Sequence, residues 1–98
     1  MNVVWTERAL LRLQHIQNYI AEDQPANALA WVNRVLERGD TLSDQPHRGR
    51  PVPEYPTAEV REVREGDYRI IYQVRAGCAE ILTVRHSSQL LPLELSQL

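Results

Sequence analysis

The spacing of apolar residues changes along the chain and divides it into a helical half and a β half. From Ala9 onward the apolar positions recur every three or four residues, the period of an α-helix with one buried face. Thr6 precedes them as a candidate N-cap, and Glu7 lies where the helix dipole favours an acid. We therefore predict a helix from Glu7 to about Ile20. Its apolar stripe consists of Ala9, Leu13, Ile16 and Ile20.

A second helical pattern begins at Pro25, which suits a first helical position because its missing N–H costs nothing there. The pattern predicts a helix to about Ser43, and the short break between the two helices predicts an antiparallel hairpin. Gly39 lies on the apolar stripe, which we interpret as the mark of a close helix crossing. The stripe consists of Ala28, Val32, Val35 and Leu42.

Residues 44–59 contain four of the six prolines, which excludes a helix or a central strand. We predict an ordered surface loop that leads from the helices to a sheet.

The remainder has β character. Alternation with period two predicts a strand over residues 68–75 with one predominantly polar face. Strands at 60–64 and 80–86 flank it across short turns, so the three are antiparallel. A further β-prone run lies at Met1–Trp5. The order β-α-α-β-β-β predicts an α+β fold, one domain over residues 1–98, with both helices on one face of a small sheet.

Composition narrows the function. The chain has 11 arginines, no lysine and 13 acids, for a net charge of −2, which disfavours avid sequence-independent binding to nucleic acid. Seven arginines lie in residues 46–98, so a local cationic patch stays open. The single cysteine, Cys78, excludes an internal disulfide. With no long apolar stretch and no signal-peptide pattern at the start, we expect a cytoplasmic protein without membrane contact.

Common catalytic motifs are absent. The chain has no glycine-rich phosphate loop and no GxSxG elbow, and its three histidines lie in three different predicted elements. We expect neither a metal nor a cofactor.

One set of polar residues could carry chemistry on a shared surface. Arginine suits phosphate contact, His86 could move protons, and Glu54 could act as its partner base. Side chains of these types are the ones that RNA cleavage by attack of the 2′-hydroxyl requires. The alternative is that each arginine is a solvating residue or pairs with an acid such as Glu62, and that His86 forms a hydrogen bond at a strand end. The set is Arg50, Glu54, Arg61, Arg69, Tyr72 and His86.

Short blocks in a fixed order carry a resemblance to a known family. They are Trp5–Ala9, Ile16–Ala21, Pro25–Ala28, Leu42–Pro46, Gly49–Glu54, Arg61–Val63, Tyr68–Tyr72 and Ile81–His86. In these blocks, from about Val3 to Leu91, the chain resembles the RelE/ParE family of type II toxin–antitoxin toxins. The resemblance implies a RelE-like fold and a cognate antitoxin whose C-terminal segment wraps over helices and sheet. It also implies growth arrest and plasmid stabilisation, and contact with operator DNA only through the antitoxin.

The family has two branches with different targets. ParE-like toxins poison DNA gyrase, whereas RelE-like toxins cleave mRNA in the ribosome. Two blocks resemble the ParE side, and Ser87–Gln89 stands where the family typically has basic residues, so gyrase inhibition without enzyme activity is favoured. The alternative is a ribosome-dependent mRNA endoribonuclease. A third alternative is a non-toxic member that only assembles with an antitoxin on operator DNA. The nuclease alternative assigns catalysis to Glu54, Arg61, Arg69 and His86.

Further candidates concern contact with the target or the antitoxin. The helical stripes are wider than one small sheet needs, so part of them could be shared with a partner. The apolar tail Leu90–Leu95 either packs on the sheet or joins an interface. The contact candidates are Leu10, Leu13, Trp31, Val35, Arg50 and Tyr72.

Overall fold

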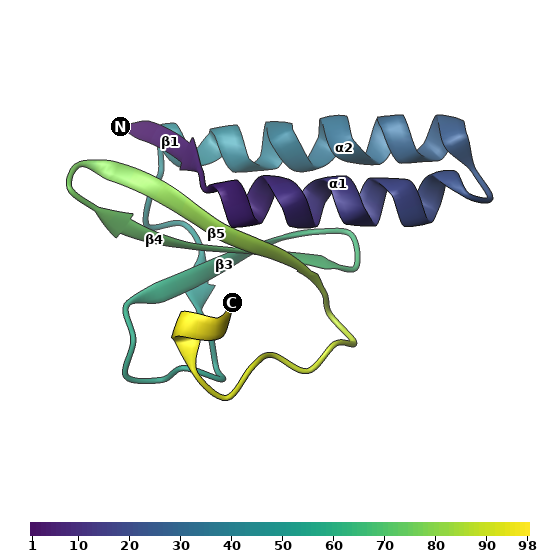
Figure 1. Cartoon of the computed structure of the whole chain (residues 1–98). Coiled ribbons are helices and arrows are strands. Elements are labelled where there is room, and N and C mark those ends of the chain that lie inside the picture. The colour runs from purple at the N-terminus through teal and green to yellow at the C-terminus, as the bar shows by residue number, and fades with distance from the viewer.

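Two antiparallel helices lie side by side across one face of a five-stranded sheet in the computed structural model, which describes all 98 residues (Figure 1). The predicted α+β fold is confirmed. The elements are β1 (Asn2–Trp5), α1 (Glu7–Ala21), α2 (Pro25–Asp40), β2 (Arg50–Pro51), β3 (Val60–Glu65), β4 (Tyr68–Arg75) and β5 (Cys78–His86), with 3₁₀ turns at Thr41–Ser43 and Leu95–Gln97. Neither helix has the length and apolar character needed to cross a membrane.

Both helices begin at the predicted residues. The Thr6 Oγ1 accepts a hydrogen bond from the Ala9 N–H at 3.1 Å and donates one to the Ile81 carbonyl at 2.9 Å. Thr6 therefore caps α1 and also fixes the start of the helix to β5. The second helix ends at Asp40, three residues before the predicted end, because the chain tightens there into a 3₁₀ turn.

Gly39 marks a close approach to the sheet rather than to the other helix, so the predicted helix crossing is wrong. A Cβ at this position would lie 2.7 Å from Trp5 Cζ2 and 3.0 Å from Ile81 Cδ1. The helix can lie this low over β1 and β5 only because the residue has no side chain.

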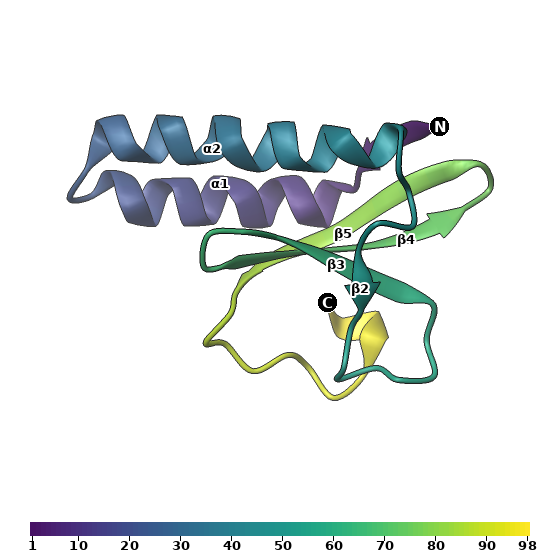
Figure 2. The same cartoon turned by 180° about the vertical axis from the view of Figure 1, so that it is seen from behind.

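The sheet has the order β1-β5-β4-β3-β2. Strands β3, β4 and β5 form the predicted antiparallel meander. The N-terminal strand β1 joins one edge and runs parallel to β5. The short β2, labelled beside β3 in Figure 2, pairs antiparallel with β3 at the other edge. Both edge positions depend on long-range pairing, for which the local sequence pattern carries no signal.

The second face of the sheet is also covered, so the polar face of β4 is partly buried rather than open to solvent. Arg69 and Ile71, which lie on that face, are 4% and 0% exposed. The 44–59 loop and the C-terminal segment fold over it and form a second apolar cluster. Its buried members are Val52, Tyr55, Val60, Ile71 and Leu98, and Leu91 and Leu95 pack against them.

The larger core lies between the helices and the sheet. All predicted stripe residues of the two helices except Ala28 are buried in this core or pack against it, together with residues from β3, β4 and β5. Its buried members are Ala9, Leu13, Ile16, Trp31, Val35, Leu42, Val63, Ile70, Tyr72, Ala79, Ile81 and Val84.

Candidate functional site

A buried ion-pair network joins the 44–59 loop to the sheet. Arg69 of β4 makes four hydrogen bonds to two carboxylates. Its Nη1 and Nη2 each lie 2.8 Å from one oxygen of Glu54, a bidentate contact. Its Nε and Nη2 lie 3.1 Å and 2.6 Å from Glu62 Oε1. The side chains of Arg69 and Glu62 are 5% and 0% exposed.

The network fixes the charge of its members. The hydrogen bonds from Arg69 hold the pKa of Glu54 below its ordinary value, although burial acts in the opposite direction. The hydrogen bond with Glu54 likewise raises the pKa of Arg69, with Glu62 adding to the effect. Glu54 is therefore a weak base, and the charge of Arg69 is neutralised by two carboxylates before any ligand arrives.

Neighbouring side chains hold the same loop by its main chain. Arg61 Nη1 donates to the Gly49 carbonyl at 2.8 Å, and the Tyr72 hydroxyl donates to the Pro46 carbonyl at 2.8 Å while accepting from the Gly49 N–H at 2.9 Å. Arg50 Nη2 lies 3.3 Å from Glu62 Oε2. Burial raises the pKa of Tyr72, although the hydrogen bond with Gly49 and the charges of Arg61 and Arg48 act in the opposite direction. Most of the predicted polar residues thus act in holding the loop.

His86 does not join this network. Its ring makes a T-shaped contact with the Tyr68 ring, with 5.1 Å between the ring centroids. Tyr68 makes a similar contact with Trp31 of α2, with 4.9 Å between the centroids. Successive residues of a strand point to opposite faces, so Tyr68 and His86 face the helices while Arg69 faces the loop. The structure brings Glu54 and Arg69 together, places Arg61 of β3 against the main chain of the loop and outside the ion-pair network, and leaves His86 on the other side of the sheet.

His86 instead lines a pocket of about 480 Å³ between α1 and the ends of β4 and β5. The α1 residues of this pocket were not among the sequence candidates. Their signal was present as a second helical stripe, polar and aromatic, at spacings of three and four. The pocket is lined by Arg12, His15, Ile16, Tyr19, Tyr68, His86, Ser88 and Gln89.

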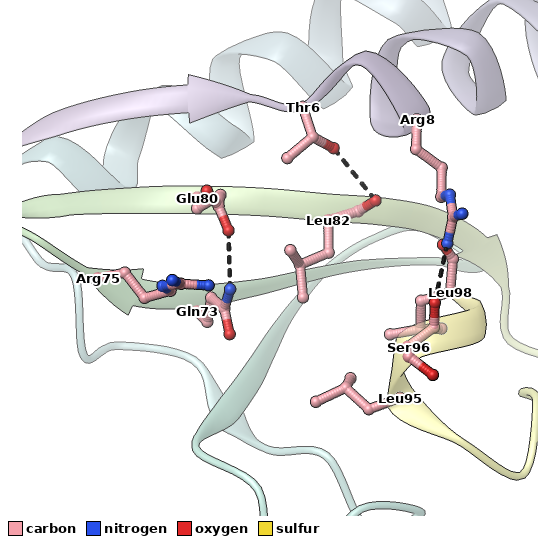
Figure 3. Close-up of a pocket in the computed structure, with 9 residues that line it drawn as sticks. All are labelled: Thr6, Arg8, Gln73, Arg75, Glu80, Leu82, Leu95, Ser96 and Leu98. Carbon is pink, nitrogen blue, oxygen red and sulfur yellow. Dashed lines mark hydrogen bonds between the residues drawn. The ribbon is translucent and has the colours of Figure 1, made fainter.

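A second pocket of about 480 Å³ lies between the C-terminal turn and the sheet (Figure 3). On one side Arg8 Nη1 donates to the Leu98 carbonyl at 2.6 Å, and on the other Gln73 Nε2 donates to Glu80 Oε1 at 2.7 Å. The tail therefore packs on the sheet face, although Leu90 and Leu93 stay 94% and 98% exposed.

No group of three or more histidine, cysteine, aspartate or glutamate side chains is arranged to hold a metal ion.

The residues predicted to contact the target or the antitoxin differ in how exposed they are. Leu13, Trp31 and Val35 are 6%, 6% and 0% exposed, since the hairpin packs its apolar stripes against the sheet. Tyr72 is also fully buried. Leu10 is 48% exposed and Arg50 is exposed, so these two offer surface to a partner.

Comparison with known proteins defines the class of this molecule as a toxin of a type II toxin–antitoxin system. The family described as "ParE toxin of type II toxin-antitoxin system, parDE" matches residues 3–91. The chain belongs to this ParE toxin family, which confirms the RelE/ParE resemblance and gives the protein a cognate antitoxin as its partner.

Two relatives and one solved structure illustrate the family. The chain is 38% identical over 89 residues to "Toxin RelE2" of Caulobacter vibrioides, covering 90% of this chain and 97% of that protein. It is 39% identical over 88 residues to "Putative toxin Y4kP" of Sinorhizobium fredii, covering 90% of each. Its fold is similar to a chain of the "Chromosomal ParDE TA system from P. aeruginosa", with TM-score 0.79, 22% identity and coverage of 88% and 95% of the two chains.

Proposed function

We propose that this toxin acts in the cytoplasm by inhibiting DNA gyrase and is not a nuclease. The match to the ParE toxin family supports gyrase as the target. The observation against a nuclease is the neutralised state of Arg69, which is buried and hydrogen-bonded to Glu54 and Glu62. A nuclease site needs a cation free to hold phosphate, with a base and an acid on either side of it. Here the cation is occupied, the base is weakened, and His86 lies on the other face of the sheet.

The proposal is tested by assaying purified gyrase on relaxed plasmid DNA with ATP and increasing amounts of the toxin. We expect micromolar toxin to block supercoiling and to increase the fraction of cleaved plasmid. The matched control is toxin mixed beforehand with an equimolar amount of its antitoxin, which should restore supercoiling. Full gyrase activity at micromolar toxin would contradict the proposal.

Ribosome-dependent mRNA cleavage is the second candidate, because Glu54 and Arg69 are adjacent and the chain is similar to a protein named Toxin RelE2. Its test is primer extension on mRNA from a translation extract. His86→Phe preserves the ring packing against Tyr68 and lies outside the Arg69 network, so loss of mRNA cuts in this folded variant would support catalysis. Toxicity that persists in His86→Phe, without A-site cuts, would exclude it.

The antitoxin is proposed to cover the exposed apolar residues of the helical hairpin. Leu10 and Leu11 of α1 are 48% and 65% exposed, and Leu29 of α2 is 60% exposed. Large apolar side chains that both helices leave exposed are typical of a protein interface. Contact with operator DNA is then made only through the antitoxin.

Leu11→Glu should weaken antitoxin binding about tenfold or more, measured by titration calorimetry, since it places a charge in an apolar contact. Leu90→Glu is the matched control, because Leu90 is more exposed than Leu11 but lies in the C-terminal tail, away from the helical hairpin. Equal affinities of the two variants would show that the antitoxin does not use this face.

A further inference from the structure

The pocket that contains His86 has the features of an anion site. Arg8, Arg12, His15 and Tyr19 follow one another at spacings of four, three and four residues, so they form one stripe along α1. The last three of them line the pocket, and β4, β5 and the turn after β5 supply the rest. No carboxylate is among the lining residues.

Arg12 stands apart from most arginines of the chain. Arg34, Arg38, Arg50, Arg64 and Arg69 are ion-paired with glutamates, and Arg8, Arg61 and Arg85 donate to main-chain or hydroxyl oxygens. Arg12 has no ion pair or hydrogen bond, although it is partly buried at the pocket wall. A partly desolvated guanidinium without an acceptor favours binding of an anion.

His86 presents a second donor to the same space. Its Nδ1 lies 3.1 Å from the Ser88 main-chain nitrogen, which can only donate, and 2.7 Å from the Ser88 hydroxyl. Nδ1 is therefore the acceptor, and the neutral ring carries its proton on Nε2. Nε2 has no partner within the protein. The packing against Tyr68 holds the ring in place, so this N–H is oriented before a ligand binds.

Positive charge is concentrated at this edge of the sheet. Arg85 precedes His86 on β5 and lies outside the pocket; burial lowers its pKa, and repulsion from Arg12 and Arg8 adds to this, although Tyr55 acts in the opposite direction. Burial raises the pKa of the Tyr68 hydroxyl, with smaller contributions from Tyr19 and Asp67, so this group stays a hydrogen-bond donor. An anion in the pocket would lie next to the Arg12 guanidinium and satisfy several donors at once.

We propose that this pocket binds the terminal phosphate of a nucleotide. Arg12 and the His86 Nε2–H hold the phosphate oxygens, and the Tyr19 ring, 69% exposed at the rim, packs against the base. A terminal phosphate is favoured over a carboxylate because it offers three oxygens to a wall that contains several donors and no acid. The volume of about 480 Å³ lies within the range of small-molecule sites. The site goes beyond the proposed gyrase inhibition and uses neither Glu54 nor Arg69.

Calorimetry of the purified chain with AMP, adenosine and inorganic phosphate tests the proposal. AMP should bind at least about tenfold more tightly than either fragment, since each lacks half of the contacts. Arg12→Gln should weaken AMP binding about tenfold. His86→Phe, which preserves the ring against Tyr68, should also weaken it. The matched control is Arg48→Gln, which removes an exposed arginine outside the pocket and should bind AMP as the parent chain does.

The outcomes separate clearly. If adenosine or inorganic phosphate binds as tightly as AMP, the claim that both base and phosphate contribute to binding is overturned. Equal AMP affinity of Arg12→Gln and Arg48→Gln, or no AMP binding by the parent chain, would overturn the site. A 5′-phosphorylated trinucleotide distinguishes two sources of the same chemistry: binding as tight as AMP assigns nucleic-acid ends, and weaker binding assigns free nucleotides. The circular dichroism of each variant confirms its fold.

Discussion

Arg69 and Glu62 form a buried ion pair in which Nη2 lies 2.6 Å from Oε1 and the two side chains are 5% and 0% exposed. Such a pair is stable only while it is complete, because loss of one partner leaves a charge without compensation in a medium that solvates it poorly. Loss of toxicity in an Arg69 variant would therefore report first on folding. A test of catalysis has to use residues whose removal leaves the network intact.

Arg69→Ala should destabilise the protein by about 3 kcal/mol or more, since Glu62 then stays buried with only longer contacts to Arg50 and Arg64. Urea unfolding at neutral pH measures the change. Arg75→Ala is the control, because Arg75 is exposed and makes no ion pair, and it should cost less than about 0.5 kcal/mol.

Replacing both Arg69 and Glu62 tests whether the loss of stability comes from the uncompensated carboxylate. Arg69→Met with Glu62→Met removes both buried charges and should recover most of the lost stability. A double variant as unstable as Arg69→Ala would mean that the pair itself, rather than the uncompensated carboxylate, holds the loop.

Glu54 gives the network a dependence on pH. The hydrogen bonds from Arg69 lower the pKa of Glu54 below its ordinary value of 4.5, so the folded state favours the ionised carboxylate. Its contribution to stability is complete above that value and is lost as the pH falls through the lowered pKa. The stability difference between the parent chain and Glu54→Gln should thus be constant at neutral pH and shrink in acid. Urea midpoints between about pH 7 and about pH 3 measure it, and a difference that does not change would contradict this role.

The helices and the meander were predictable because each has a local signal. Thr6 caps α1, Pro25 begins α2, and period-two alternation marks β4. The second covered face was not predictable from the same alternation. Arg69 has the spacing of a solvent-facing residue, and only the loop that folds back over it makes it a buried ion-pair residue.

The candidate site was predictable in its members but not in its arrangement. The sequence pointed to Glu54, Arg69 and His86 as one set, and named Glu62 only as a possible partner acid. Which side of the sheet each residue faces depends on strand register and on the path of the loop. Arg69 and Glu54 are fifteen positions apart in the sequence. A contact between two such distant residues produces no periodic pattern in a single sequence, so it could not be predicted.

Tyr72→Phe should destabilise the protein by about 1–3 kcal/mol, because the hydroxyl both donates to the Pro46 carbonyl and accepts from the Gly49 N–H in a buried setting. Tyr55→Phe is the matched comparison. Its hydroxyl makes one hydrogen bond, to the Pro92 carbonyl at 2.6 Å, so the smaller change is expected there. Thermal unfolding of the two variants measures the difference, and a larger loss for Tyr55→Phe would place the stronger anchor on the tail rather than on the loop.

Gly39→Ala should destabilise the protein although alanine is the better helix former by about 1 kcal/mol. The added Cβ would lie 2.7 Å from Trp5 Cζ2 and 3.0 Å from Ile81 Cδ1, so α2 has to lift from the sheet or the indole has to move. Overpacking of this kind costs about 1–3 kcal/mol, which outweighs the gain in helix propensity. Urea unfolding of Gly39→Ala in the parent chain and in a Trp5→Leu background separates the two effects. The alanine should cost less where the indole is absent, and an equal cost in both backgrounds would show that the close approach to Trp5 does not set the position of the helix.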